Sequence, residues 1–230
     1  MSVTLCLERS SLVRINLSFS LLLGSCQLAS EVSNDVGNPL LQLHLVISNG
    51  GGRNIQIKSI TLIVERDNQQ ISSLQAQSYL QLPSDDNAIL LTPFRIKLVE
   101  EWGHSINFFA HLSREEEKQL REHRSALRNN ILSKRVGKSE SEIVEADDGY
   151  IKPLTDFFDN KFVWKPGEYR LHLSISADPG SANVSRSYRF TLFESDRDTL
   201  TQHVDGYKYG EGIYFPSSNY IGINLGIKED

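Results

Sequence analysis

Residues 166–175 read PGEYRLHLSI and residues 187–193 read SYRFTLF, and these two stretches decide the fold. In both stretches apolar and polar residues alternate, which is typical of a strand with one buried face. Pro-Gly opens the first stretch, and Asp-Pro-Gly at residues 178–180 separates the two strands with a second turn. We therefore predict an antiparallel hairpin here.

The same alternation runs through the first half of the chain. The strands that it predicts there cover residues 3–7, 15–21, 40–47, 55–64, 88–91, 94–98 and 102–112. Two of these strands, at 40–47 and 55–64, flank a glycine-rich segment at 48–52. Because glycine and asparagine adopt positive φ at little cost, this arrangement predicts a second hairpin with a glycine-rich tip.

The apolar and polar alternation is interrupted at two places, and each interruption predicts a local structure. The alternation slips between Ile57 and Ile60, which indicates a β-bulge near Lys58. Residues 65–77 are polar and rich in Gln and Ser, so we expect a loop with a short strand there.

The period changes after residue 112. Ser113 and Glu116 have the spacing of a capping box, and good helix formers continue to about Lys134. The apolar stripe is narrow, with Leu120, Leu127 and Ile131 as its members. A helix with so narrow an apolar face is expected to lie on the surface of the β-structure rather than inside it.

The chain after this helix is first polar and then returns to apolar residues. Residues 136–149 (VGKSESEIVEADDG) are acidic and polar, so we expect a mobile loop. The β pattern is expected to resume at residues 157–158 and 162–164, which are aromatic or aliphatic.

The hairpin at 166–193 resembles the closing pair of many bacterial immunoglobulin-like domains. The Asn-Gly turn at 49–50 and the strand after it are similar to an earlier hairpin of such domains. The resemblance covers about half of the chain and speaks to fold alone, because that fold hosts many functions. It implies a mainly β protein, namely an immunoglobulin-like antiparallel β-sandwich with one inserted amphipathic surface helix.

This interpretation divides the chain in two. Residues 1–195 form the β-sandwich, with the helical insertion at about 113–135 and the mobile loop at about 136–150. Residues 196–230 form a C-terminal extension that packs on the sandwich.

Composition argues against several functions. The formal net charge is −5, and no basic stripe provides the electrostatic surface that nucleic-acid binding needs. The two cysteines, Cys6 and Cys26, match no metal-ligand spacing and are expected to be free thiols. No run approaches the ~18 to 20 apolar residues of a membrane span.

The N-terminal region supports two interpretations. Residues 23–26 (LGSC) resemble a bacterial lipoprotein cleavage box, in which Cys26 carries the lipid and the preceding residues are removed. However, residues 15–21 alternate strictly, whereas the core of a signal peptide is continuously apolar. We favour β-structure at residues 2–23 of the mature protein, and the cytoplasm over a lipid-anchored place in the envelope.

One cluster suggests metal chemistry. Asp196, Asp198 and His203, with Asp205 nearby, could together bind a divalent metal that activates water. A simpler explanation is that the first two carboxylates begin a short helix, where negative charge is favourable. No zinc signature and no nucleophile elbow accompanies the cluster.

Aromatic residues and glycines alternate closely in the C-terminal extension. Tyr207, Tyr209, Tyr214 and Tyr220 offer rigid apolar faces with polar tips, which suits a recognition surface. Packing into the core is the alternative for the same residues.

The sequence thus predicts a non-catalytic protein-binding or assembly module that needs no cofactor and binds another protein. A metal-dependent hydrolase that uses the C-terminal carboxylates is one alternative. An envelope lipoprotein anchored through Cys26 is another. The oligomeric state stays open.

Overall fold

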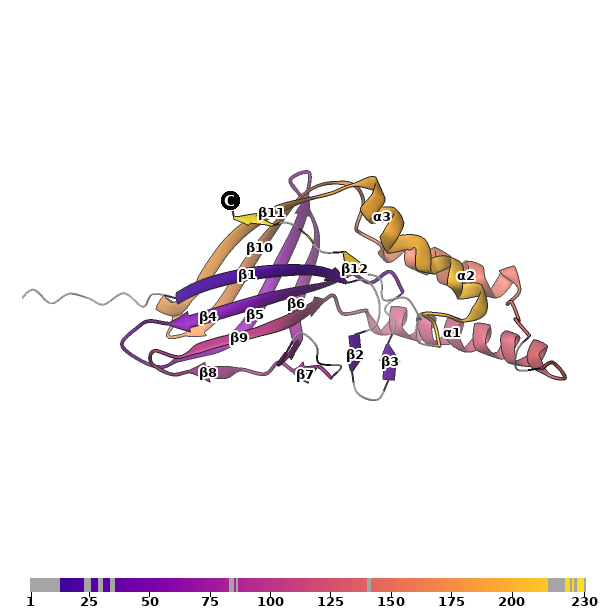
Figure 1. The fold of residues 1–230 in the computed structure, drawn as a ribbon, viewed down its shortest axis with the longest axis horizontal. Coiled ribbons are helices and arrows are strands. Elements are labelled where there is room, and N and C mark those ends of the chain that lie inside the picture. Colours follow the sequence, from indigo (N-terminus) through magenta and orange to yellow (C-terminus); the bar gives the residue numbers. More distant parts are fainter. Residues whose placement is uncertain are drawn as a thin grey trace, which may run out of the picture.

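A single curled antiparallel sheet, with helices at one of its ends, makes up most of the structure (Figure 1). The computed structural model describes residues 13–22, 26–28, 31–33, 36–82, 85, 87–139, 142–214, 222–223, 225 and 227–229. Within these ranges the chain is mainly β, as the alternation predicts.

The elements follow one another in this order along the chain. The strands are β1 Val13–Leu22, β2 Cys26–Leu28, β3 Glu31–Ser33, β4 Leu40–Asn49, β5 Ile55–Arg66, β6 Gln69–Leu80, β7 Ile89–Leu90, β8 Phe94–Ile96, β9 Glu101–Phe109, β10 Gly167–Asp178, β11 Val184–Leu192, β12 Gly222–Ile223 and β13 Lys228–Glu229. The α-helices are α1 Arg114–Arg135, α2 Asp148–Lys161 and α3 Glu194–Thr201, and the 3₁₀ helices are η1 Gly180–Ala182 and η2 Gln202–Tyr209.

The sheet is continuous rather than a sandwich of two sheets. Its strands lie in the order β12-β1-β4-β9-β6-β5-β10-β11-β13, with β7 beside β6 and β8 beside β5. Only β2 and β3 pair separately within the described residues. The antiparallel, mainly β architecture is therefore confirmed, whereas one curled sheet takes the place of the two stacked layers that we expected.

The last strands show how strongly the sheet curls. β12 pairs with β1 at one edge, and β13 pairs with β11 at the other. Five residue steps from Ile223 to Lys228 span at most about 17 Å, whereas a flat sheet of this strand order would separate its outer strands by about 38 Å. Ile223, Leu225 and Ile227 also pack against the core as the chain passes between the edges. The C-terminal extension thus joins the two edges of the sheet.

Strand pairing confirms one predicted hairpin and corrects the other. β10 and β11 pair from Gly167↔Leu192 to Ile175↔Val184, and the predicted bulge lies at Lys58, which β10 skips. The prediction that β4 and β5 form a hairpin is wrong, because β9 and β6 lie between these strands. The side-chain amide of Asn49 lies 2.9–3.1 Å from three carbonyl oxygens, those of Arg53, Ile96 and Lys97. These contacts hold the glycine-rich segment near β8, so the chain does not fold back on β4.

The loop expected at residues 65–77 is instead a tight hairpin. β5 continues to Arg66, and β6 begins at Gln69. Asp67 and Asn68 between them have φ of 52° and 62°, which are the positive values that a two-residue hairpin turn requires. The Gln and Ser residues of β6 that suggested a loop mostly lie on the less buried face of the strand.

The sequence predicts the first α-helix but not the second. α1 has the expected capping box, and its buried residues are Leu120, Leu127 and Ile131, as the apolar stripe predicts. The prediction of a strand at residues 157–158 is wrong, because Phe157 and Phe158 belong to α2. Three α-helices thus replace the single inserted one within the described residues.

The N-terminal strand prediction is confirmed where the structure describes it. β1 pairs along β4 from Val13↔Asn49 to Leu21↔Leu41. Residues 2–12 and 23, which belong to the same prediction, lie outside the described residues, as does Cys6.

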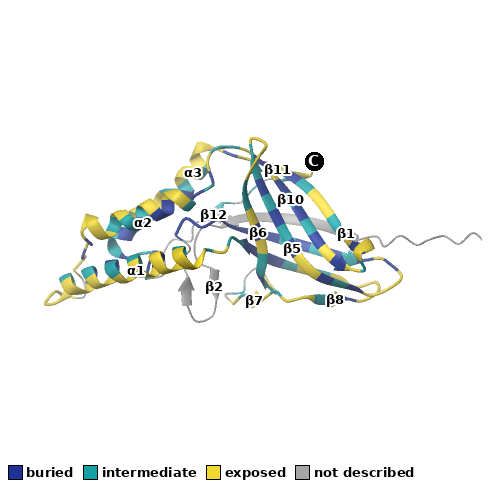
Figure 2. Cartoon of the chain, turned by 180° about the vertical axis from the view of Figure 1, so that it is seen from behind, coloured by how far each residue is buried: buried dark blue, intermediate teal, exposed yellow. Residues whose placement is uncertain are grey.

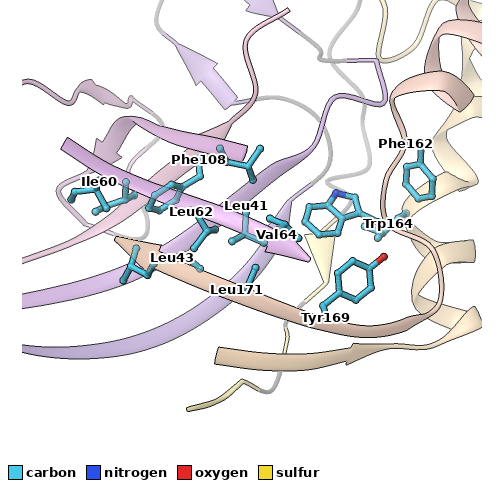
Figure 3. Close-up of a cluster of buried hydrophobic side chains, with 14 of the residues drawn as sticks. Leu41, Leu43, Ile60, Leu62, Val64, Phe108, Phe162, Trp164, Tyr169 and Leu171 are labelled. Atoms are coloured by element: carbon cyan, nitrogen blue, oxygen red, sulfur yellow. The ribbon is translucent and has the colours of Figure 1, made fainter. Parts of the chain in front are cut away.

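A group of aromatic side chains connects the sheet to the helices. Trp164 and Tyr169 lie between the sheet core and Phe162, at the end where α2 leads into β10 (Figure 3). The Tyr169 ring stacks on Phe190 with 4.8 Å between ring centroids. Its hydroxyl lies 2.6 Å from the carbonyl oxygen of Lys165 and 3.1 Å from that of Val163. Burial of the ring raises the pKa of Tyr169, so the hydroxyl stays protonated and donates.

We expect Tyr169→Phe to lower the free energy of unfolding by about 0.5–1.5 kcal/mol, because two partly buried carbonyl groups lose the hydroxyl that donates to them. Urea unfolding measures the change. Tyr188→Phe on the neighbouring strand is the matched control, because the Tyr188 ring is buried as well, whereas its hydroxyl has no hydrogen bond within the described residues. Equal losses in the two variants would contradict the role given to the Tyr169 hydroxyl.

Candidate functional site

The helices form a hairpin that extends away from the sheet. α1 and α2 run in opposite directions and lie side by side (Figure 1). Apolar residues of both helices are buried, and on α2 they are Leu154, Phe157 and Phe158. The hairpin therefore has an apolar interior of its own, continuous with the sheet core.

An ion pair fixes the end of the hairpin nearest the sheet. Glu116 accepts a hydrogen bond from the Ser113 backbone at 2.8 Å and also contacts the ammonium group of Lys161 at the end of α2. The hydrogen bond from Lys161, and then that from Ser113, lower the pKa of Glu116 to about 2. The residue that completes the α1 cap thus also holds α2.

The segment between the helices is tied to α1 where the structure describes it. Asn130 and Asp147 exchange two hydrogen bonds, of 2.8 and 3.0 Å, and the Lys134 ammonium group lies 2.5 Å from Asp147. Lys134 also donates to the carbonyl oxygen of Glu145 at 3.0 Å. Glu145 and Asp147 are therefore tied to α1 by specific bonds, while the mobility expected at about 136–150 stays a prediction.

Apolar side chains are exposed at the end of the hairpin that is remote from the sheet. Val136 directly follows α1 and is 82% exposed, and Ile143 is 75% exposed. Leu132 in the last part of α1 and Tyr150 in the first turn of α2 are exposed as well. Figure 2 shows that much of the surface of the two helices is exposed. We call these four residues the hairpin tip.

The C-terminal extension follows the hairpin and carries the predicted tyrosines. Tyr207 is 1% exposed and packs edge-on against Phe158, so it lies in the core. Tyr209 is half-buried beneath the Lys208 ammonium group, which lies 4.8 Å from its ring centroid. Tyr214 is half-buried, and Tyr220 lies outside the described residues.

A glycine makes the packing of Tyr214 possible. Gly210 has φ of 81°, and a Cβ atom there would lie 2.1 Å from the Tyr214 ring. Only glycine satisfies both requirements. The extension therefore turns sharply at this point and brings Tyr214 back over its own backbone.

The predicted metal ligands have other partners. The Asp196 carboxylate accepts a hydrogen bond from the Phe193 backbone at 2.9 Å, and so caps α3. Asp198 and Asp205 are exposed. His203 packs edge-on against Phe158, and burial lowers its pKa. No three Asp, Glu, His or Cys side chains within the described ranges come together as a metal site.

The hairpin tip is the feature that sequence reasoning missed. Its signal was present, since Val136 and Ile143 are isolated aliphatic residues in an otherwise polar stretch. Such residues in a loop are either buried by another element or exposed, and only the structure distinguishes these outcomes. Val144, next to Ile143, is buried.

Comparisons with known proteins add little. No family model matches the chain, and no curated protein matches it. The chain is similar to a protein of known crystal structure from Archaeoglobus fulgidus at a TM-score of 0.31 and 7% sequence identity, over 79% of this chain and 98% of that one. No helix within the described residues has both the length and the apolar composition that crossing a membrane requires.

The Glu116 carboxylate predicts a specific dependence of stability on pH. Its pKa is depressed in the folded state, so its contribution is present above about pH 4.5 and is lost as the pH falls towards about 2. Between about pH 4.5 and 2 the free energy of unfolding should therefore fall less in Glu116→Gln than in the unaltered protein. At pH 7 its cost should be below about 1 kcal/mol, because the pair is partly exposed.

Urea unfolding at several pH values between 2 and 7 measures this effect. Glu117→Gln is the matched control, because Glu117 is exposed and lies one position further along the same helix turn. An unchanged pH dependence in Glu116→Gln would show that the link between the helices does not depend on this charge.

Proposed function

We propose that this protein is a protein-binding or assembly module whose hairpin tip inserts into an apolar pocket on a partner protein. The observation that carries the proposal is the exposure of Val136 and Ile143 at the far end of the hairpin. Burying such side chains contributes about 25 cal/mol per Å² of apolar surface. An apolar end on a projecting element is a typical interaction site.

The charges around the tip favour a protein over a lipid surface. Binding to anionic lipids needs unpaired basic residues beside the apolar ones. Here Lys138 pairs with Glu142 at 2.9 Å, and Lys208 pairs with Glu145 at 3.1 Å. Lys134 pairs with Asp147, as described above. Arg135, next to Val136, is a further basic residue, but the acidic residues around the tip leave it without an excess of positive charge, which suits the polar rim of a protein interface.

The hairpin presents the tip in a fixed position. Hydrogen bonds from Asn130 and Lys134 order the chain before binding, so less conformational entropy is lost in the complex. Tyr209 at the end of η2 and Tyr214 after it belong to the C-terminal extension, and we expect them to extend the contact surface. Tyr207 supports that surface from beneath, within the core.

Val136→Ser combined with Ile143→Ser tests the proposal. Both side chains are exposed, so we expect the free energy of unfolding to change by less than about 0.5 kcal/mol for each substitution. Capture of the partner from extracts of the native host should be lost. Photocrosslinking from a reactive residue placed at position 138, between the two, identifies the partner that is captured.

The matched control is Leu90→Ser in β7, which removes an equally exposed aliphatic side chain elsewhere on the surface. It should capture the same partner as the unaltered protein. Retained capture by the double variant would contradict the proposal. Binding to vesicles of anionic lipid that the double variant abolishes would replace the protein partner with a membrane surface.

A further inference from the structure

A row of basic side chains runs along one surface of α1. Successive members lie four, three, seven and seven residues apart, so at 100° per residue they fall within about 100° around the helix axis. α1 has 22 residues, and the row is therefore about 30 Å long. We call it the basic stripe, and its members are Arg114, Lys118, Arg121, Arg128 and Arg135.

The positive charges of the stripe are not compensated. All five side chains are exposed, and none has an ion pair or a side-chain hydrogen bond with another described residue. Glu117 and Glu122 border the first half of the stripe, yet neither lies within ion-pair distance of it. Arg128 and Arg135 have no acidic residue three or four positions away in the chain. Like charges three and four positions apart are unfavourable on a helix, so the stripe suits an anionic partner.

The period of the helix explains why the sequence did not reveal this surface. The basic residues alternate there with acids and amides, and we predicted no basic stripe. Within α1 the intervening Glu116 and Asn130 face α2 instead, where they bond to Lys161 and Asp147. Folding thus moves these polar groups away from the cations, and the prediction is corrected.

The spacing of the stripe matches that of a second helix. Ser125 and Leu132 occupy the two positions that complete the row, which then alternates between steps of four and three residues. This alternation averages 3.5 residues, the period at which two helices stay in contact along their length. A helix that carries carboxylates at the same intervals would place a negative charge beside each cation.

Two other anionic surfaces fit the stripe less well. The backbone of a nucleic-acid duplex winds once in about 34 Å, so it diverges from a straight row of similar length. Glu117 and Glu122 at the border of the row also repel phosphates. A lipid surface requires apolar side chains among the basic ones, whereas Leu132 is the one apolar residue of the row.

We propose that the basic stripe binds an acidic helix of the partner whose apolar pocket receives the hairpin tip. This inference rests on the proposed function and adds the chemistry of the partner, namely Asp or Glu along one helix face at steps of three and four residues. Leu132 belongs to both surfaces, so the acidic helix and the pocket are adjacent on the partner. Exposed ion pairs contribute little affinity each, so the stripe chiefly determines orientation and association rate.

The first test uses the full chain and two stapled helical peptides of identical alanine and glutamate composition. One peptide has its glutamates on a single face, at alternating steps of four and three residues, and the other has them spread around the helix. Fluorescence anisotropy at low salt should show the one-face peptide binding about 10-fold more tightly, and added salt should weaken its binding. Equal affinities would overturn the proposal, because net charge alone would then explain the binding.

A charge variant locates the site. Arg121→Gln combined with Arg128→Gln should weaken binding of the one-face peptide by about 2- to 30-fold, since each exposed pair contributes a factor of about 1.5 to 5. The matched control is Lys58→Gln combined with Arg95→Gln, which removes the same charge from two exposed residues of the sheet. The control should bind as the unaltered protein does, and an equal loss in both variants would contradict a defined site. Circular dichroism checks that each variant is folded.

The native partner separates this inference from the proposed function. Loss of capture in the variant with Val136→Ser and Ile143→Ser, with an unchanged association rate in the stripe variant, would overturn the acidic helix alone. Retained capture in that tip variant would contradict the proposed function, whereas its binding of the one-face peptide should be unaffected in either case. Tighter binding to a short DNA duplex or to anionic vesicles than to the peptide, abolished in the stripe variant, would replace the helix with that surface.

Discussion

The hydroxyl of Tyr169 holds the short connection between α2 and β10, and this contact helps to position the helical hairpin at the end of the sheet. Its two carbonyl neighbours, Val163 and Lys165, belong to the connection itself, while the ring stacks on Phe190 in the sheet. A tyrosine suits this position, since its ring packs in the sheet core and its hydroxyl donates to partly buried backbone carbonyl groups. Together with the Glu116–Lys161 ion pair, this side chain holds the helices where they leave the sheet.

Local features of the fold could be predicted from the sequence, whereas pairing between distant strands could not. The cap of α1 needs only Ser113 and Glu116, and the β10–β11 hairpin needs only neighbouring residues. The position of β4 depends on β1 and β9, which no local pattern encodes. α2 was missed because adjacent phenylalanines fit a buried strand as well as the i, i+3, i+4 spacing that Leu154, Phe157 and Phe158 have.

The same distinction holds for the candidate sites. Closely spaced tyrosines and carboxylates are visible in the sequence, yet Tyr207 lies in the core and Asp196 caps a helix. Glu65 and His172 are far apart in the chain and individually unremarkable. Only the register of β5 against β10 brings them within hydrogen-bond distance. Sequence spacing therefore groups only those polar residues that are close along the chain, whereas the strand order of the sheet brings together polar residues that are far apart in the chain.

The bridge formed by residues 222–229 also bears on the order in which the protein is made. These residues leave the ribosome after every other described strand, yet they pair with two residues at the outer edge of β1 and two at the outer edge of β11. A nascent chain that lacks them has two unpaired strand edges, and such edges can pair with those of other chains. Contacts between the first and last strands also form slowly, because a long loop must close before they are made. Synthesis of this protein therefore includes an interval of exposed edges in which chaperones that bind extended segments have a substrate.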